Sequence, residues 1–297
     1  MEWLECIKKT IDYMEHHLLD AEGAEAIANE VYISPFYLQK GFKLMTGYTM
    51  SEYIRNRRLY LAALDVIADT DKVIDIAYKY GYETPESFTK AFSRFHGYTP
   101  MQIRSDARRI KVFLPLKISI SIQGGNDMDY VVEKMKAFKV IGFERSFDFN
   151  SSYQEIPKFW EETYTNYIKP LCAKEKAEGE LEETITKCCI GEFGICIDDS
   201  SEIGKFRYLI AGIYKDGKVP EGLTVYDIPE VEWAKFKCIG PLPGALQAVN
   251  TKIFKEWLPG NAEYVTSLGI NIEWYSNEKT TTDPNYESAV WIPVKRR

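Results

Sequence analysis

Large apolar side chains recur at helical spacing in two places along the chain. Two sets of three such residues occupy positions i, i+4 and i+7: Leu38, Phe42 and Met45, and then Phe88, Phe92 and Phe95. Residues at this spacing share one face of an α-helix, so each stretch is predicted to bury one face and to expose the other. The exposed faces are expected to carry Phe36, Gln39, Lys40 and Lys43 in the first helix, and Glu86, Thr89, Lys90 and Ser93 in the second.

The two predicted helices lie in two copies of one motif. Residues 34–50 read "SPFYLQKGFKLMTGYTM", and residues 84–100 read "TPESFTKAFSRFHGYTP". Each copy starts with a hydroxyl residue and a proline, which favour a helix start, and closes near a glycine, which favours a helix end. A shorter helical segment precedes each copy, and "MSEYIRNRRLYLAALDVIAD" between them is predicted to be a long connecting helix. The pattern predicts an all-α domain over residues 1–108 that contains two helix-turn-helix units.

Periodicity alone also fits a structural helical repeat that contacts no DNA, and the charge pattern bears on this choice. The net charge is −7, yet basic residues gather in two clusters. The first contains Lys40, Lys43, Arg55, Arg57 and Arg58, and the second contains Lys90, Arg94, Arg104, Arg108, Arg109 and Lys111. Local basic patches can bind phosphates in a domain that is neutral overall, and outward-facing Gln, Lys, Thr and Glu side chains can read base edges. Both features favour DNA binding over a purely structural repeat.

The second half of the chain has the pattern of strands. "KISISIQ" alternates apolar and polar residues, "GGND" indicates a turn, and "MDYVVEKM" follows, which together predict a hairpin. "AFKVIGF" at 137–143 recurs as "KFKCIGP" at 235–241, and each copy is followed by a helical stretch and two strand-like segments. The order ββαββ, written twice, predicts an α+β domain over residues 112–297 with two similar halves. The junction between the halves is the expected ligand site.

The composition excludes several other classes of protein. Apolar residues make up 45% of the chain, but no apolar run approaches the ~18 residues of a membrane span, so no membrane contact is expected. The start, "MEWLECIKKT", lacks an apolar signal core, and the six cysteines are scattered, which favours reduced thiols in the cytoplasm. His16 and His17 are expected at an exposed helix end. No metal site, cofactor or catalytic residue is expected.

The first domain resembles the DNA-binding domain of the AraC family of transcription regulators. "IAYKYGYETPESFTKAFSRFHGYTP" is close to the signature of that family, and "YIRNRRLYLA" matches its linker helix. The resemblance implies two recognition helices that enter successive major grooves, with base-facing residues Phe36, Gln39, Lys40, Glu86, Ser87, Thr89 and Lys90. It implies phosphate contacts from Arg55, Arg57, Arg58 and Arg94. The family often has glycine where this chain has Tyr32, although Gly81 is present in the second unit.

The second domain resembles the GyrI-like effector-binding domain. "GPLPGALQAVNTKIFKEWLP", "VWIPV", "IPKFW" and "FRYLIAG" carry the resemblance, and the domain order is similar to that of the Rob type of AraC-family regulator. In "GINIEWYS", alternation places Ile270 and Ile272 on one face, expected beneath helices, and Asn271, Glu273 and Tyr275 on the other. Glu273 and Tyr275 match a Glu-x-Tyr pattern of the family. Further aromatic candidates for the ligand site are Trp160, Tyr208 and Trp291.

These features predict a sequence-specific transcription regulator that responds to a small effector. A carboxylate surrounded by aromatic rings suits a lipophilic cation of the multidrug kind. The expected partners are promoter DNA and the effector, with RNA polymerase as a candidate, and the protein is expected to be a monomer or a weak dimer. The alternative is a GyrI-like protein that sequesters or hydrolyses a small molecule, with Glu273 as a general base. Against hydrolysis, the second half contains no histidine and no Gly-x-Ser-x-Gly motif.

Overall fold

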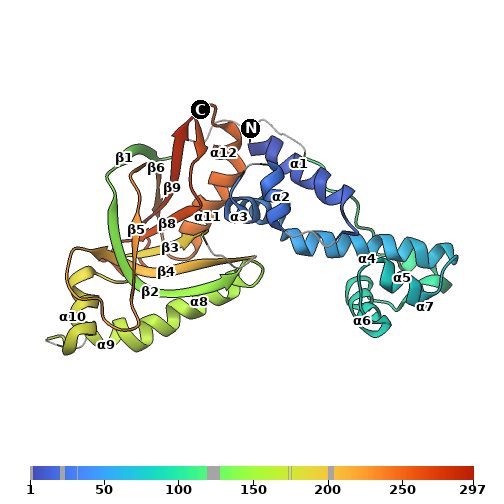
Figure 1. The fold of residues 1–297 in the computed structure, drawn as a ribbon, viewed down its shortest axis with the longest axis horizontal. Helices are drawn as coiled ribbons and strands as arrows, with labels where there is room; N and C mark the ends of the chain where they lie inside the picture. The colour runs from blue at the N-terminus through green and yellow to red at the C-terminus, as the bar shows by residue number, and fades with distance from the viewer. Residues whose placement is uncertain are drawn as a thin grey trace. The chain divides into compact units, whose positions relative to one another are not determined.

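The chain folds into two compact units. The structure is a computed structural model that describes residues 3–20, 24–31, 33–118, 128–172, 174, 176–199 and 204–297 (Figure 1). The helical unit comprises Met1–Ile33 and Thr46–Ile122, and the sheet unit comprises Ser34–Met45 and Gln123–Arg297. The helix α3 (Pro35–Thr46), which the sequence places in the first helix-turn-helix, is therefore part of the sheet unit apart from its last residue.

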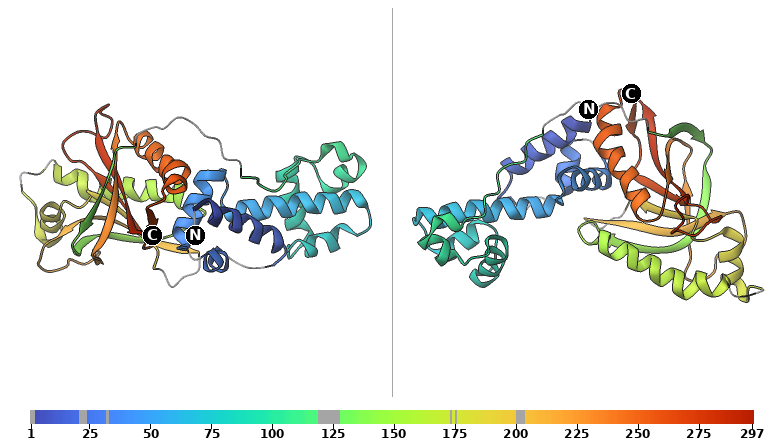
Figure 2. Two further views of the ribbon diagram at one scale, coloured as in Figure 1. Left: turned by 90° about the horizontal axis from the view of Figure 1, so that it is seen from above. Right: turned by 180° about the vertical axis from the view of Figure 1, so that it is seen from behind.

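The helical unit packs short helices against one long helix. Its helices are α1 (Trp3–His16), α2 (Ala24–Val31), α4 (Met50–Ala68), α5 (Val73–Lys79), α6 (Pro85–His96) and α7 (Pro100–Ser105). Figure 2 shows α5, α6 and α7 grouped around one end of α4. Their shared core contains Leu59, Phe88, Phe92 and Ile103, which confirms the apolar face predicted for α6. Among the described helices of the chain, none is both long and apolar enough to cross a bilayer.

The repeated Gly-Tyr-Thr sequence serves two adjoining helix ends. Gly97 closes α6 with a φ of 81°, and Gly47 has a φ of 82°, a conformation that glycine adopts without steric cost. Thr49 and Thr99 then cap α4 and α7, each with a capping box. Gly81 has the positive φ, 80°, that the turn before α6 requires, whereas Tyr32 lies outside the described residues.

The sheet unit contains one antiparallel sheet and the helices that pack on it. The strands are β1 (Tyr130–Met135), β2 (Phe138–Asp148), β3 (Phe193–Ile197), β4 (Lys205–Tyr214), β5 (Thr224–Ile228), β6 (Val231–Ile239), β7 (Tyr264–Thr266), β8 (Ile270–Tyr275) and β9 (Glu287–Arg296). Besides α3, the α-helices are α8 (Ser152–Thr163), α9 (Lys169–Cys172), α10 (Gly179–Cys188), α11 (Gly244–Lys252) and α12 (Leu258–Gly260). The segments Tyr164–Ile168 and Ile253–Trp257 continue α8 and α11 as π-helix.

The strand order reflects the predicted duplication. It runs β1-β6-β9-β8-β3-β4-β2-β5, with β7 paired to β9. The order is symmetric about the β8–β3 pair, where the two halves meet, and the first strand of each half pairs with the second strand of the other. β1 thus pairs with β6, while most of the other arm of the hairpin predicted at 117–135 lies outside the described residues.

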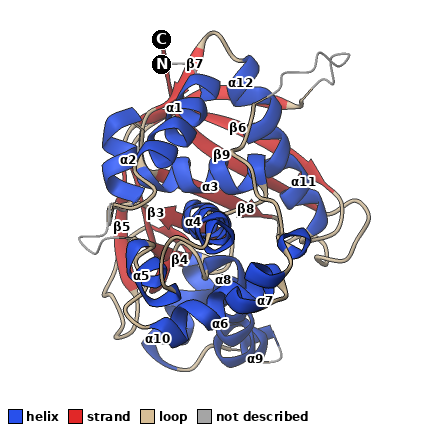
Figure 3. Cartoon of the chain, turned by 90° about the vertical axis from the view of Figure 1, so that its right-hand side faces the viewer, coloured by secondary structure: helices blue, strands red, loops and turns tan. Residues whose placement is uncertain are grey.

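The two faces of the sheet carry different partners. One face holds an apolar cluster whose described members all come from strands, including Ile195, Ile272 and Trp233. The other face packs on helices, with α8 against β2 and α11 against β6 and β9, and Figure 3 shows α11 and α12 in front of the strands. The prediction that helices cover the isoleucines of β8 is therefore wrong, because this sheet buries them against its own strands. Glu273 consequently lies on the helix-covered face.

Arg57 of the connecting helix α4 is a structural residue in the folded chain. Its guanidinium donates to both carboxylate oxygens of Glu15 at 2.8 Å and to the carbonyl of Phe113 at 2.6 Å. The residue is only 5% exposed, so the prediction that Arg57 contacts phosphate is corrected. Arg55, two residues earlier on the same helix, is exposed. The sequence places both arginines in one basic cluster, and only the packing shows that Arg57 is buried while Arg55 reaches solvent.

We expect Arg57→Ala to lower the free energy of unfolding by about 2–4 kcal/mol, because it leaves the half-buried Glu15 carboxylate without its ion-pair partner and with the Tyr53 hydroxyl as its remaining donor. Arg55→Ala is the matched control, with an expected change within about 0.5 kcal/mol. Urea denaturation followed by circular dichroism measures both. Equal stability of the two variants would contradict the structural role of Arg57.

His96 at the end of α6 is buried as the neutral imidazole. The backbone N–H of Lys111 donates to its Nδ1 at 3.1 Å, and its Nε2 lies 3.1 Å from the carbonyl oxygen of Leu59. These partners place the proton on Nε2 and leave Nδ1 as an acceptor. Burial lowers the pKa of His96 below its ordinary value of 6.5. Protonation of His96 would therefore cost the helical unit stability.

The stability of the wild-type chain should fall as the pH drops below about 6.5, because the unfolded state then binds a proton that the folded state resists. The loss should level off once the folded imidazole also protonates, and His96 should contribute no slope above about pH 7.5. The urea midpoint between pH 8 and pH 5 measures this slope. His96→Gln should show a shallower dependence, and identical slopes in the two proteins would rule out His96 as the source.

Candidate DNA-binding surface and effector site

The helix α6 presents the polar face that the sequence predicts. Glu86, Ser87, Lys90 and Arg94 are exposed and Thr89 is half-buried. On the opposite face Phe88 and Phe92 are buried and Phe95 is partly buried. Thr84 caps the helix, and its hydroxyl accepts the backbone N–H of Ser87 at 3.1 Å. A short, capped helix with free polar side chains on one face has the geometry that reads a major groove.

The helix α3 has a different environment, because its predicted outward face packs within the sheet unit. Phe36 is 3% exposed and lies beside the rings of Phe149 and Phe206, at centroid distances of 6.2 and 5.5 Å. Lys40 donates to the side-chain carbonyl of Asn271 at 2.8 Å. The expectation that Phe36 is exposed is therefore wrong in this structure. Gln39, Lys40 and Lys43 are each half-buried.

The remaining predicted phosphate contacts are not equivalent. Arg55 and Arg94 are exposed. Arg58 is half-buried, and its guanidinium donates to the carbonyls of Leu18 and, at 2.8 Å, Asp20. Arg55 and Arg94 are thus the arginines of this set whose side chains are most accessible to a phosphate.

Four of the five predicted ligand residues come together on the helix-covered face of the sheet. The hydroxyl of Tyr275 donates to Oε2 of Glu273 at 2.8 Å, and the hydroxyl of Tyr208 lies 3.4 Å from the same oxygen. Trp160 of α8 donates from its indole nitrogen to the Tyr208 hydroxyl at 2.8 Å, and its ring meets that of Tyr275 edge-on at 5.2 Å. The cluster lies at the β8–β3 junction of the two halves.

The protonation of the cluster follows from its burial. Burial, together with the Glu273 charge, raises the pKa of Tyr208 and of Tyr275 well above the ordinary value, so both hydroxyls keep their protons. Within the described residues, the Glu273 carboxylate has these hydroxyl donors and no ion-pair partner. The site therefore offers an anion with aromatic walls.

Trp291 does not join this cluster. It stands opposite Ile272 in the register of β8 and β9, which directs it to the apolar face of the sheet. There its ring contacts Phe193 and Trp233 at 5.8 and 6.3 Å, and the Lys235 ammonium lies 3.9 Å from its centroid. The prediction that Trp291 binds ligand is corrected, because only the strand register shows which face it occupies.

Two residues that the sequence analysis did not single out shape the cluster. Gly194 lies opposite Glu273 on β3, and a Cβ there would stand 2.2 Å from the Tyr208 hydroxyl. Asn271, completely buried, lies two residues before Glu273 on the same face. Strand alternation could have indicated Asn271, but nothing in the sequence marks Gly194.

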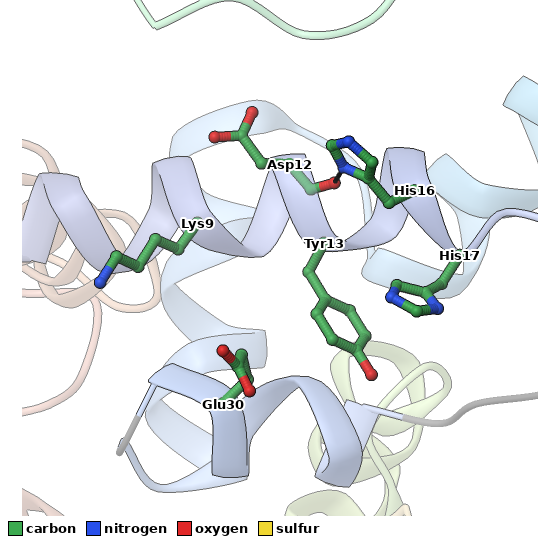
Figure 4. A pocket seen from close by; sticks show the side chains of 6 residues that line it. All are labelled: Lys9, Asp12, Tyr13, His16, His17 and Glu30. Atoms are coloured by element: carbon green, nitrogen blue, oxygen red, sulfur yellow. Dashed lines mark hydrogen bonds between the residues drawn. The ribbon is translucent and has the colours of Figure 1, made fainter.

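A hollow in the helical unit lies between α1 and α2 (Figure 4). Lys9, Asp12, Tyr13, His16, His17 and Glu30 line it. His16 is exposed at the end of α1, as predicted, whereas His17 is half-buried and its ring stacks on that of Tyr13 at 4.2 Å. Among the described residues, no group of three His, Cys, Asp or Glu side chains is placed to hold a metal ion.

Comparison with known proteins defines both parts of the chain. The model of the integron-associated effector binding protein family matches residues 132–294, and a helix-turn-helix domain model matches residues 27–106. The regulatory protein SoxS of Salmonella typhimurium is 32% identical over 104 residues, which cover 35% of this chain and 97% of SoxS. The uncharacterized HTH-type transcriptional regulator YbfP of Bacillus subtilis is 28% identical over 159 residues, which cover 52% of this chain and half of YbfP.

Among solved structures, SAV2435 bound to tetraphenylphosphonium is 23% identical, with coverage of 57% of this chain and 94% of that chain at a TM-score of 0.45. The sequence matches define an AraC-type DNA-binding protein with a second, effector-binding part. The chain belongs to the AraC-type helix-turn-helix regulators that carry a domain of the integron-associated effector binding protein family. The predicted domain order is thereby confirmed.

Proposed function

We propose that this protein is a transcription regulator that binds promoter DNA through its helix-turn-helix units and responds to a small cationic effector bound at Glu273. The exposed polar face of α6, mounted on a buried apolar core, is the observation that carries the DNA-binding part. A regulator of DNA acts where the DNA is, so we expect it in the cytoplasm, with RNA polymerase as a further partner. Two recognition helices on one chain make a monomer sufficient.

The helix-turn-helix part favours regulation over the alternative of a protein that only sequesters or hydrolyses a ligand. A sequestering protein needs no DNA-reading helix, and this chain presents one with Glu86, Ser87 and Lys90 exposed. Within the described residues, the hydroxyls around Glu273 donate to its carboxylate and keep their protons, which supports a binding role for this carboxylate. Turnover of a small molecule that is lost on Glu273→Gln would overturn this assignment.

The electrostatics of the Glu273 site support a cation as the effector class. Among the described residues, neutral hydroxyls are the donors to the half-buried Glu273 carboxylate. Such a carboxylate attracts positive charge more strongly than an exposed one, because solvent screens it less. The rings of Trp160 and Tyr275 stand beside it and add cation–π attraction. A lipophilic cation would satisfy both the charge and the aromatic surface.

We expect Lys90→Ala to relax the base preference at one position and to weaken binding to a selected duplex about 5- to 160-fold, since a lysine–guanine contact contributes about 1–3 kcal/mol of discrimination. The duplex is selected from a random pool by the wild-type chain, and fluorescence anisotropy at fixed salt measures affinity for it and for random DNA. Lys139→Ala, which removes an exposed lysine of β2, is the control and should leave both affinities unchanged.

An equal loss on selected and random DNA would show that Lys90 contacts phosphate rather than a base. No binding to any duplex by the wild-type chain would refute the proposed function itself.

We expect Glu273→Gln to weaken binding of tetraphenylphosphonium at least tenfold and to leave the neutral triphenylphosphine oxide unaffected, because the amide keeps the shape of the carboxylate and removes its charge. Isothermal titration calorimetry on the full chain measures both ligands. Glu287→Gln, which neutralises an exposed carboxylate on the neighbouring strand, is the matched control. A parallel loss of both ligands would argue for a packing role of Glu273 instead of charge recognition.

A further inference from the structure

The helix α3 is anchored to the sheet unit by its N-terminal end. Oδ2 of Asp198 accepts the backbone N–H of Phe36 at 2.8 Å and the hydroxyl of Ser34 at 2.7 Å. A carboxylate at the first turn of a helix satisfies donors that have no partner within the helix and interacts favourably with its dipole. Gly269 leaves the room for this contact, since a Cβ there would lie 2.8 Å from Cβ of Asp198.

Two side chains of α3 also contact β8. The Tyr37 hydroxyl donates to the carbonyl of Ile270 at 2.6 Å, and its ring lies 6.2 Å from that of Phe254. Lys40 donates to Asn271, the next residue of the strand. Tyr37 is completely buried, and Phe36 nearly so, which indicates a packed interface rather than a loose contact. Two predicted base-facing residues, Phe36 and Lys40, are thus engaged by the sheet unit and cannot contact DNA at the same time.

The contact between α3 and β8 adjoins the proposed effector site along the same strand. Asn271, which holds Lys40, and Glu273 share a face of β8 two residues apart, or about 7 Å along the strand. Burial raises the pKa of the Cys196 thiol, on the β3 residue opposite Asn271, and the charges of Lys40 and Glu273 act on this pKa in opposite directions. A monovalent cation at Glu273 would neutralise that carboxylate, so the surroundings of Lys40 would carry one negative charge fewer.

We propose that the sheet unit holds α3 as an autoinhibitory segment and that a cationic effector at Glu273 releases it for DNA binding. Because coupling between two sites is reciprocal, docked α3 must in turn weaken the binding of the cation. This inference rests on the proposed function and adds a mechanism of regulation to it. In the docked state only α6 is available for base reading, and release of α3 restores the second recognition helix.

The test removes the contact of Asp198 with Ser34 and Phe36 by a substitution in the sheet unit, so the DNA-reading residues stay unchanged. Asp198→Ala should raise the affinity of the full chain for the selected duplex about 5- to 150-fold without any cation, the range that is typical of allosteric coupling. It should also reduce the further gain that tetraphenylphosphonium produces. Asp199→Ala removes the adjacent exposed carboxylate, which pairs with Arg207 and not with α3, and should behave as wild type. Tyr37→Phe is a second variant that keeps the test valid if Asp198→Ala folds poorly. It removes only the hydrogen bond to Ile270 and should likewise raise the affinity for the selected duplex.

Hydrogen exchange gives a readout that does not depend on DNA. Added tetraphenylphosphonium should increase amide exchange in α3 and leave α6 unchanged, and Asp198→Ala should show the increase without the cation. If the cation and the duplex both bind but α3 protection and DNA affinity do not respond to Asp198→Ala or to the cation, the inference fails while the proposed function stands. Weaker DNA binding by Asp198→Ala would likewise overturn it.

Discussion

The pairing of β3 with β8 is the interaction on which the sheet unit depends. It joins the two halves of a duplicated sequence into one sheet, and its register fixes which side chains face the helices. Because side chains alternate along a strand, the same register places Ile272 among the strands of the apolar cluster and Glu273 beneath α8. A shift of one residue would exchange these two environments and would bury the carboxylate in the apolar cluster.

The helix-covered face then brings Glu273 close to the residue that holds α3. Glu273 is held by the hydroxyls of two tyrosines, and Asn271 on the same face holds the lysine of α3. Both contacts are polar bonds in partly buried surroundings, where the loss of one partner costs more than at an exposed surface. Under the proposed function, a ligand that alters the charge at Glu273 would act on the Asn271–Lys40 contact without any large movement of the strand.

Packing in the helical unit buries one of the arginines of its basic cluster. Arg57 is bonded to Glu15, whereas Arg55 on the same helix is exposed. Charge counting along the sequence treats the two alike, although only the accessible one is free to meet a phosphate. The surface that a phosphate can contact is set by the lysines and arginines that reach solvent. A locally cationic surface is therefore compatible with an acidic net charge.

The sequence by itself determined the two domains, the paired helix-turn-helix motifs with their caps and the duplicated ββαββ pattern. It also indicated the four candidate ligand residues that the structure brings together: Glu273, Tyr275, Tyr208 and Trp160. These follow from local periodicity, turn residues and motifs, which are encoded by neighbouring positions. Only the tertiary structure decided that Trp291 occupies the opposite face, that Arg57 is buried and that α3 packs on the sheet unit. Each of these depends on contacts between residues far apart in the chain, such as Phe36 with Phe206 or Arg57 with Glu15, and no local pattern encodes such pairs.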